Sequence, residues 1–303
     1  ISKGTLWSTS AILNEKYHKL IVDTHLAYIK SGAEVITTNT FSSRRIRMDQ
    51  NKVSRYFEYA NKKACELAIQ AKQNSKKDLV NTVFNSVFKK YDLMNDIMSF
   101  GIHRLWKSNL IDWLQPKLNS KLIDMASGTG DMTKLFIERT NFTGQATMVD
   151  QNIEMLNEGK KKLEYYKNID SLCASAEQVP LKDSSYDYYI ISFGIRNVTD
   201  IKKTLSEAYR LLKPGGRFMC LEFSKINNEI IDKFYSIYSS FIPHIGKAVA
   251  GDRKPYEYLI QSIKDFYNQE QLLNLMKEAK FINAEYRNLT TGVAAIHSGW
   301  KIK

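Results

Sequence analysis

The sequence predicts an α/β protein whose main part is a doubly wound, mostly parallel sheet with helices on both faces. From about residue 79 onward, short apolar segments alternate with segments of helical period, the pattern of a parallel sheet. A turn with two glycines, residues 127–130, joins the first of these strands to a helix. Before residue 79 the pattern gives only helix, strand and helix. We therefore expect an incomplete α/β extension there, too short to close a sheet of its own.

The alternation after residue 79 places each element of the sheet. The expected strands are four apolar runs and a terminal pair: 121–126, 145–150, 186–192, 217–223, 281–289 and 293–302. The expected helices between them are 131–139, 153–166 and 201–212. Residues 81–115 are expected to be mainly helical and to lie in front of the sheet.

The N-terminal extension ends at a polar stretch. Helical spacing covers 14–31 and 53–72, and the run Ala33 to Thr40 has the composition of a short buried strand. Residues 72–78 are polar and carry no apolar period, so we expect a linker there. The expected domains are therefore 1–75 and 76–303.

Composition and charge exclude several classes of protein. With 303 residues, 43% hydrophobic and 25% charged, the chain is globular rather than disordered or collagen-like. No apolar run reaches the roughly 18 residues of a membrane-spanning helix. The net charge of +12 divides into +7 over residues 1–80 and +5 over the rest, and neither part has a basic stripe interleaved with aromatics, so a nucleic-acid partner is not expected. Attraction to an anionic membrane surface stays open.

The cysteines, the histidines and the first residues of the chain lead to expectations about metal binding and cellular location. Three widely spaced cysteines form neither a disulfide framework nor a metal motif, and the five histidines show no ligand spacing, so we expect no metal. The chain begins with Ile and shows no basic-plus-apolar leader, so we expect a cytoplasmic protein.

The turn after the first strand carries the chemistry. Gly128 and Gly130 let the backbone turn tightly and approach a ligand, and the following helix offers free N–H groups. The pattern is GxG followed by Asp131, which would repel a pyrophosphate and suits a cationic ligand better. Asp124, in the strand that enters the turn, adds a second carboxylate.

Two later positions complete a cofactor pattern. Asp150 follows Gly130 by twenty residues and can accept hydrogen bonds from both ribose hydroxyls, although a plain surface carboxylate remains an alternative. Ser175 and Ala176 lie where a third strand would end, near the expected adenine, although an ordinary loop remains an alternative. Glycine turn, ribose acid and adenine loop in this order are typical of Rossmann-like methyltransferases that use S-adenosylmethionine, a class with a seven-stranded sheet.

From about Leu79 to Lys303 the sequence resembles the ubiquinone/menaquinone biosynthesis C-methyltransferase family, which methylates a polyprenyl quinol. The matching segments are 83–87, 91–96, 101–107, 127–131, 191–200, 221–225, 256–259 and 292–297. The run Ser192 to Val198, Ser-Phe-Gly-Ile-Arg-Asn-Val, is the most distinctive of them. The resemblance implies a polyprenyl quinol as substrate. It also leads us to consider a membrane surface, a quinone-biosynthesis complex and a second copy of the chain as partners, with the enzyme peripheral on the inner face of the membrane.

The resemblance also assigns residues. It implies that the cofactor is held by Thr129, Asp150, Ser175, Ala176 and Ser192, beside Gly128 and Gly130. Arg196 and Asn197 follow a motif strand, and we expect them to stabilise a developing phenolate and to fix the ring. The resemblance suggests that Arg196 acts through a water shared with Asp150. A surface salt bridge remains the alternative for Arg196.

Three further features have two interpretations each. His103 is either a base or a packing residue. Two apolar sets belong either to the core or to a route for the prenyl tail: Phe234, Ile237, Tyr238, Phe241, Ile245 and Val249 in one, and Tyr91, Met94, Met98 and Trp106 in the other.

For the function of the whole protein, two alternatives remain. It could be a methyltransferase that acts on another small molecule, or a non-catalytic scaffold in a quinone-biosynthesis complex.

The extension has a resemblance of its own. Leu6 to Ser8, the helix with His25 and Tyr28, and the run 31–41 resemble the N-terminal part of the homocysteine S-methyltransferase barrel family. That family needs a complete barrel and a cysteine-bound zinc, and Cys65 is alone here. We therefore expect a truncated remnant or a fusion without activity of its own.

Overall fold

The computed structural model describes residues 6–87, 95–96, 99, 101–225 and 254–302. The chain divides into two compact units, residues 1–80 and 81–303. In the part that the structure describes, no helix is long and apolar enough to cross a bilayer.

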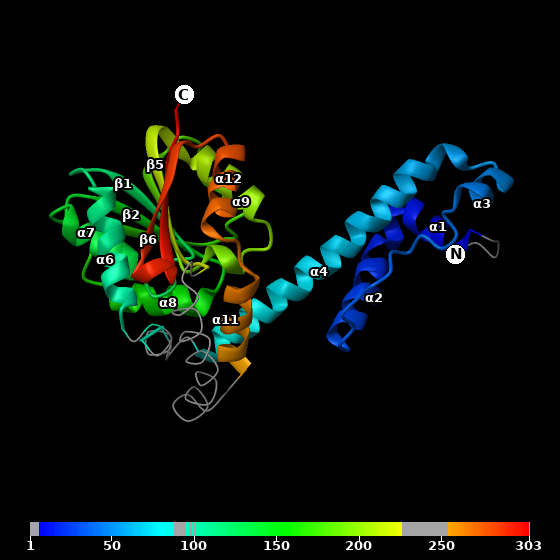
Figure 1. The fold of residues 1–303 in the computed structure, drawn as a ribbon, viewed down its shortest axis with the longest axis horizontal. Coiled ribbons are helices and arrows are strands. Elements are labelled where there is room, and N and C mark those ends of the chain that lie inside the picture. Colours follow the sequence, from blue (N-terminus) through cyan, green and yellow to red (C-terminus); the bar gives the residue numbers. More distant parts are fainter. Residues whose placement is uncertain (1–5, 88–94, 97–98, 100, 226–253, 303) are drawn as a thin grey trace. The chain divides into compact units, whose positions relative to one another are not determined.

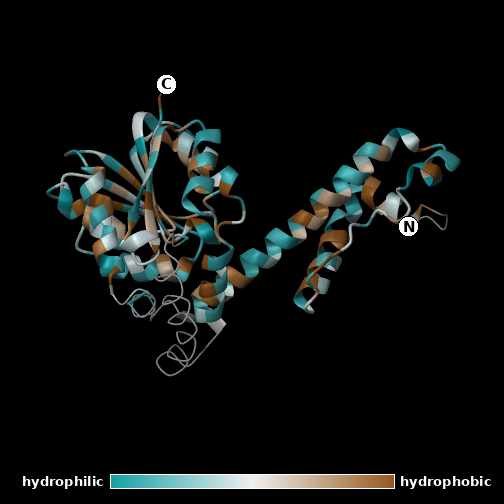
Figure 2. Ribbon diagram, viewed as in Figure 1, coloured by the Kyte–Doolittle hydropathy of each residue, from teal (hydrophilic) through white to brown (hydrophobic). Residues whose placement is uncertain are grey.

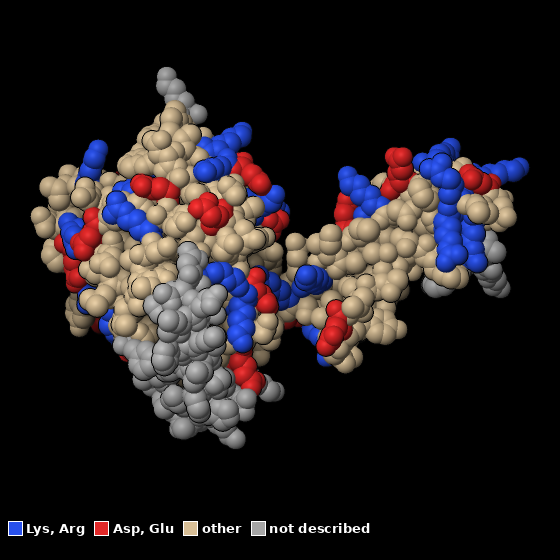
Figure 3. Space-filling view, in the orientation of Figure 1, with Lys and Arg blue, Asp and Glu red and all other residues tan. Residues whose placement is uncertain are grey.

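The surface charge differs between the two units. Figure 3 shows Lys and Arg gathered over α3 (Arg45–Gln50) in the first unit, whereas positive and negative side chains are mixed on the visible face of the second unit.

The regular elements in the described part of the first unit are all helices (Figure 1). Its helices are α1 (Trp7–Leu13), η1 (Glu15–Tyr17), α2 (His18–Lys30), α3 (Arg45–Gln50), η2 (Ser54–Tyr56) and α4 (Phe57–Val87), which continues into the second unit. Its small core is made by residues of α1, α2, α3 and α4: Ile12, Ile21, Val22, Met48, Ala60, Ala64, Leu67 and Ala71.

Two predictions for this unit are wrong. The run Ala33 to Thr40 is irregular chain rather than a strand, and Val35 in its middle is 84% exposed. A strand needs a partner for its backbone groups, and no other strand lies in the described part of this unit. Residues 72–78 form no linker but lie inside α4, because Lys and Gln are good helix formers and the stretch contains neither Gly nor Pro.

The second unit is built on a seven-stranded sheet of order β3-β2-β1-β4-β5-β7-β6 (Figure 1). Its strands are β1 (Lys121–Met125), β2 (Gln145–Asp150), β3 (Ile169–Cys173), β4 (Tyr186–Ser192), β5 (Leu212–Phe223), β6 (Ile282–Leu289) and β7 (Ala294–Trp300). The first five are parallel, and β7 runs antiparallel to both of its neighbours. The predicted sheet and its terminal strand pair are confirmed.

Helices cover both faces of the sheet. They are α6 (His103–Leu114), α7 (Asp131–Arg139), α8 (Ile153–Lys162), η4 (Ile195–Asn197), α9 (Ile201–Leu211), α11 (Lys254–Asp265), α12 (Gln269–Glu278) and η5 (Thr290–Gly292). Alternate residues of β1 face opposite sides: Leu122 packs with α6 and α7, whereas Ile123 packs with α9 and α12. Figure 2 shows the hydrophobic strands enclosed between helices whose outer sides are hydrophilic. This two-sided burial explains why the inner strands β1, β2 and β4 are mostly apolar, whereas the edge strand β6 alternates half-buried and exposed residues.

Strand β5 begins before the expected strand 217–223 and contains a turn. Its pairing with β4 jumps from Leu212 opposite Tyr186 to Arg217 opposite Tyr188, so residues 213–216 bulge out of the ladder. Gly215 has a φ of +77°, a conformation that favours glycine.

Candidate active site

The candidate site lies at the carboxyl ends of β1, β2, β3 and β4, where a parallel sheet of this kind binds its ligands. Directly after β1 the backbone turns through Ala126, Gly128 and Gly130, all with positive φ. A non-glycine residue in that region is uncommon, and such backbone strain concentrates at functional sites. Phe193, directly after β4, has a φ of +55° as well.

The turns after β1 and β4 touch each other. A Cβ added to Gly194 would lie 2.4 Å from the Cβ of Ala126, so only glycine fits at that position. On the other side, a Cβ on Gly159 of α8 would lie 3.0 Å from the carbonyl oxygen of Gly128 and 3.1 Å from the carbonyl carbon of Thr129. Two distant glycines therefore let the neighbouring elements hold the turn in place.

Asp150 at the end of β2 is bonded to this turn. Its Oδ2 accepts a hydrogen bond from the Gly128 N–H at 2.9 Å, and its Oδ1 accepts one from the Asn152 N–H at 2.8 Å. Burial raises the pKa of the carboxyl group, and these two bonds oppose the rise. A carboxylate has about four acceptor positions, so each oxygen can take a further hydroxyl donor. The group can therefore accept hydrogen bonds from two hydroxyls of a ligand.

Ser175 and Ala176 lie beside Asp150. Cys173 at the end of β3 pairs with Asp150, and the Ala174 N–H donates to the Asp150 carbonyl oxygen at 3.2 Å. The Ser175 hydroxyl donates to Glu177, and Ala176 is buried. The structure therefore brings the predicted adenine loop next to the predicted ribose acid.

Glu177 fastens this loop to the segment after β4, a role that the sequence did not assign. Its Oε1 accepts from the Thr199 N–H at 2.7 Å and from the Thr199 hydroxyl at 2.6 Å. Burial would raise the Glu177 pKa, but the bonds from Ser175 and Thr199 hold it below its ordinary value. Its position directly after Ser175 and Ala176 was the sequence signal for it.

Two buried hydroxyls of the site make no hydrogen bond within the described residues. They are Ser127 Oγ, in the turn after β1, and Ser192 Oγ, at the end of β4. A buried polar atom without a partner costs free energy, and such atoms usually mark a ligand or water position. With the acceptors of Asp150, they fit a polar ligand lying across the strand ends.

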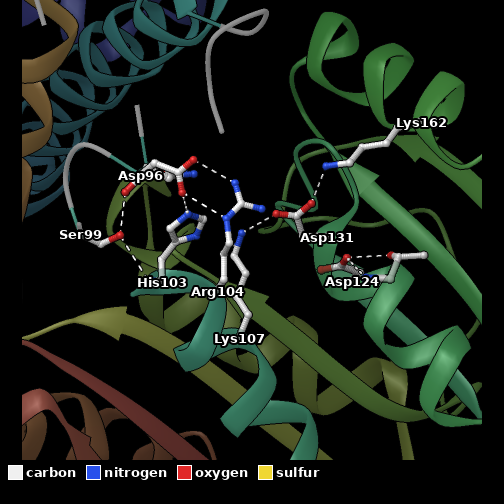
Figure 4. A network of polar contacts seen from close by, with 10 residues as sticks. Asp96, Ser99, His103, Arg104, Lys107, Asp124, Asp131 and Lys162 are labelled. Atoms are coloured by element: carbon white, nitrogen blue, oxygen red, sulfur yellow. Dashed lines mark hydrogen bonds and ion pairs between the residues drawn. The ribbon is translucent and has the colours of Figure 1, made fainter. Parts of the chain in front are cut away.

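Asp131 and Asp124 do not serve as a cation site, which corrects the expectation from sequence (Figure 4). Asp131 forms ion pairs with Lys107 of α6 at 2.8 Å and Lys162 at the end of α8 at 2.6 Å. Asp124 is buried, and its Oδ2 accepts from the N–H and the hydroxyl of Thr133 at 3.0 and 2.7 Å. Asp131 therefore links the start of α7 to α6 and α8, and Asp124 links β1 to α7.

These two carboxyl groups have opposite pKa shifts. Burial raises the pKa of Asp124 to about 7. Burial acts in the same direction on Asp131, but Lys107 and Lys162 outweigh it and hold the Asp131 pKa well below its usual range. Asp131 is therefore a carboxylate at neutral pH, whereas Asp124 is shared between its two protonation states.

Arg196 of η4 is buried in an ion pair, so the surface salt bridge considered for it is wrong. Its Nη1 contacts Glu222 Oε1 at 2.5 Å and the Phe193 carbonyl oxygen at 2.9 Å, and its Nε donates to Ser262 Oγ at 3.3 Å. Burial raises the pKa of Glu222, and Arg196 opposes that rise. Glu222 lies in the family segment 221–225, but the sequence alone indicated no role for it.

Asn197 contacts a tyrosine of α11. Its Oδ1 accepts from the Tyr258 hydroxyl at 3.1 Å. Burial raises the pKa of Tyr258, and the nearby Arg196 lowers it. Tyr258 belongs to the family segment 256–259, which was the only sequence signal for it.

His103, at the start of α6, is bonded to Asp96. Its Nε2 lies 2.9 Å from Asp96 Oδ1, and Asp96 also pairs with Arg104 (Figure 4). Burial lowers the His103 pKa, so the ring is neutral near pH 7. A packing role fits these contacts.

The two apolar sets lie mostly outside the described residues. All of Phe234, Ile237, Tyr238, Phe241, Ile245 and Val249 do, as do Tyr91, Met94 and Met98. Trp106 is described and belongs to the core against Phe193 and Phe223, with its indole N–H on Thr290 Oγ1 at 2.9 Å. Within the described residues no group of His, Cys, Asp or Glu is arranged to hold a metal.

The comparisons with solved structures define the class. A methyltransferase from Thermotoga maritima, described as S-adenosylmethionine-dependent and a possible histamine N-methyltransferase, matches with a TM-score of 0.52 and 19% identity, covering 73% of this chain and 99% of that one. A putative methyltransferase bound to the Trm112 activator of Haloferax volcanii matches with a TM-score of 0.54 and 14% identity, covering 73% and 98%. The second unit has the fold of the class I S-adenosylmethionine-dependent methyltransferases.

Sequence comparison narrows the class to one family. The model of the ubiE/COQ5 methyltransferase family matches residues 71–301, and the chain belongs to that family. A ubiquinone/menaquinone biosynthesis C-methyltransferase UbiE from Ruegeria sp. is 48% identical over 234 residues, which are 76% of this chain and 93% of that protein. The UbiE of Rickettsia bellii is also 48% identical and is covered to 96%. The family match begins at residue 71, so the barrel-family resemblance of residues 1–72 stays a prediction.

Proposed function

We propose that this protein transfers a methyl group from S-adenosylmethionine to a ring carbon of a polyprenyl quinol in ubiquinone or menaquinone biosynthesis. The observation that carries the proposal is family membership over residues 71–301, with UbiE relatives 48% identical that are covered to nine-tenths of their length. The class I fold and the strand-end turns support the same chemistry.

The cofactor is assigned to the turns after β1, β2, β3 and β4. Asp150 would hold the ribose hydroxyls, and Ser175 and Ala176 would border the adenine. Gly128, Thr129 and Gly130 would hold the part of the ligand nearest to α7, and Ser192 Oγ at the end of β4, which makes no hydrogen bond among the described residues, would be a further contact. When bound, S-adenosylmethionine supplies an electrophilic methyl group on a sulfonium.

The quinol is assigned to Arg196 and Asn197. A ring carbon attacks a methyl group well only when electron density is pushed onto it, which loss of a phenolic proton achieves. The Arg196 guanidinium is buried and fixed by Glu222, Ser262 and the Phe193 carbonyl, so its charge is preorganised to stabilise a phenolate oxygen. Asn197, held by Tyr258, would orient the ring.

The proposed substrate leads to a proposal about the membrane and the protein partners of the enzyme. A polyprenyl tail is insoluble in water, so we place the enzyme at a membrane surface, on its cytoplasmic side. A quinone-biosynthesis complex and a homodimer are part of this proposal. Co-sedimentation with quinol-containing vesicles tests the membrane association.

The function is tested with reduced short-chain benzoquinol and naphthoquinol under anaerobic conditions, with methyl-labelled S-adenosylmethionine. Labelled product from at least one quinol is the expected result, and the ratio of the two rates identifies the ring. A folded protein that binds the cofactor and labels neither quinol would contradict the proposal and favour a scaffold.

A further inference from the structure

A cavity lies in the methyltransferase unit between α6 and the edge strand β6. Figure 1 labels these two elements. Its volume is about 630 Å³, and its wall includes Trp113, Arg217, Arg287, Leu289 and Ile296. None of the residues assigned to the cofactor or to the quinol ring lines it. The cavity therefore needs an explanation of its own.

Arg217, in the wall of this cavity, is a buried cation. The residue is 6% exposed, its Nε donates to Ser298 Oγ at 2.8 Å, and its Nη1 donates to the Trp113 carbonyl oxygen at 2.7 Å. Its guanidinium also lies 5.2 Å from the ring centre of Trp113 and 4.8 Å from that of Trp300. Buried arginines are normally paired with an acid, but among the described residues this one makes no ion pair.

Arg287 of β6 brings a second positive charge to the same wall. Its guanidinium lies 3.9 Å from the ring centre of Trp113, and it too forms no ion pair within the described chain. Burial lowers the pKa of Arg217; Glu285 opposes this, and the charge of Arg287 lowers the pKa further. The carboxylate in the wall, Asp112, is bound to Arg139.

We propose that this cavity binds the phosphate group of a small anionic ligand between Arg217 and Arg287. A guanidinium presents a planar fork of donors that matches the oxygens of a phosphate, and both forks are held in place by Trp113. The volume lies in the range of small-molecule sites, roughly 300–1,000 Å³, so it accommodates more than the phosphate alone. Leu289 and Ile296 offer apolar contact to the remainder.

The first experiment locates binding on the full-length protein with sodium pyrophosphate as the probe. Indole N–H signals of the four tryptophans are followed by nuclear magnetic resonance, with Trp113→Phe used to assign one of them. The signals of Trp113 and Trp300 are expected to move saturably at millimolar pyrophosphate. No movement of either signal would overturn the proposal.

The second experiment separates a built site from general attraction of anions. Arg287→Gln removes an exposed charge and should weaken pyrophosphate binding at least about tenfold, the effect of losing a hydrogen bond to a charged group. The matched control is Lys160→Gln, which removes the same charge from an exposed position on α8. Equal weakening in both variants, or none in Arg287→Gln, would overturn the proposal.

The third experiment identifies the source of the phosphate group, which is either a soluble phosphate ester or a phospholipid headgroup. Binding to vesicles of phosphatidylglycerol is compared with binding to vesicles of phosphatidylcholine, for the unaltered protein and for Arg287→Gln. Loss of phosphatidylglycerol binding in the variant indicates a headgroup, whereas unchanged vesicle binding with weakened pyrophosphate binding indicates a soluble ester. Both results support the phosphate site. Methyl transfer to a soluble quinol should be the same in both proteins, so the two proposals fail independently.

Discussion

At the residue scale, Asp150 combines a structural and a proposed ligand-binding role. The same carboxylate that holds Gly128 and Asn152 faces the expected ribose, so its loss affects the turn as well as the ligand. Asp150→Ala should weaken S-adenosylmethionine binding by about 1.5–3 kcal/mol, the range for hydrogen bonds to a charged group. Asp150→Asn should lose less, since one oxygen still accepts.

Titration calorimetry measures both affinities. The control is Asp170→Ala, which removes an exposed carboxylate from the neighbouring strand β3 and should leave the affinity unchanged. Unchanged affinity in both Asp150 variants would show that the ribose lies elsewhere.

Substitution of Arg196 tests whether its guanidinium stabilises the developing phenolate in the transition state. Arg196→Ala should lower kcat by about 10²-fold or more, the scale of one lost electrostatic donor, with cofactor affinity nearly unchanged. Arg196→Lys should recover only part of the rate, because an ammonium keeps the charge and loses the planar fork. Steady-state kinetics with a soluble quinol and saturating cofactor provide the measurement.

The buried ion pair requires a stability control for this prediction. Arg196→Ala leaves Glu222 buried without its partner, which destabilises the fold independently of catalysis. Thermal unfolding of each variant is therefore recorded, and kcat is compared only below the transition. A folded Arg196→Ala variant with near-normal kcat would make the residue purely structural.

Asp124 predicts a pH dependence of stability. Its pKa in the folded protein is raised to about 7 from an ordinary value near 3.8, so between these values the folded state binds the proton more tightly than the unfolded state does. This group therefore stabilises the fold less as pH rises from about 4 to about 7. Asp124→Asn should flatten that decline while keeping an acceptor for Thr133.

The measurement is the free energy of unfolding in urea, taken at several pH values for both proteins. The difference between the variant and the unaltered protein should grow in favour of Asn as pH rises from about 4 to about 7, and should level off above 7. A difference that does not change with pH would contradict the raised pKa.

At the element scale, Gly159 determines how closely α8 approaches the turn after β1. A Cβ there would lie 3.0–3.1 Å from backbone atoms of Gly128 and Thr129 and 2.5 Å from the Cε of Met148. Backbone yields less than a side-chain end, so Gly159→Ala should cost about 1–3 kcal/mol of stability and weaken cofactor binding. Lys160→Ala, one residue further along and exposed, is the matched control.

Urea unfolding and titration calorimetry measure the two effects. Gly159→Ala with control-like stability and affinity would show that the turn is not held by α8.

Some elements could be predicted from the sequence to the residue, and others could not. Strands β2 and β4 and helix α7 have the bounds expected from their apolar patterns, because burial on both faces or on one stripe leaves a local signature. The run Ala33 to Thr40 carried the same signature and is not a strand, since pairing depends on a distant partner. The prediction of a cationic ligand for Asp131 was wrong for a similar reason. Its ion-pair partners, Lys107 and Lys162, lie 24 and 31 positions away in the sequence.

At the scale of the whole molecule, the methyltransferase fold is contained in one of the two units. The sheet and every residue assigned to the cofactor or the quinol lie after residue 80. We expect a protein that begins at Lys77 to fold and to methylate at the rate of the full chain. Circular dichroism and the quinol assay check this, and a folded but inactive protein would assign the first unit a part in catalysis.

The central claim is that the methyl group goes to carbon. The most direct measurement is the position of the label in the product formed from methyl-labelled S-adenosylmethionine and a reduced short-chain quinol, determined by mass spectrometry and carbon NMR. The account predicts label on a ring carbon beside a hydroxyl-bearing position, in a product that the Asp150→Ala variant forms more slowly at limiting cofactor. Label on a phenolic oxygen would contradict it.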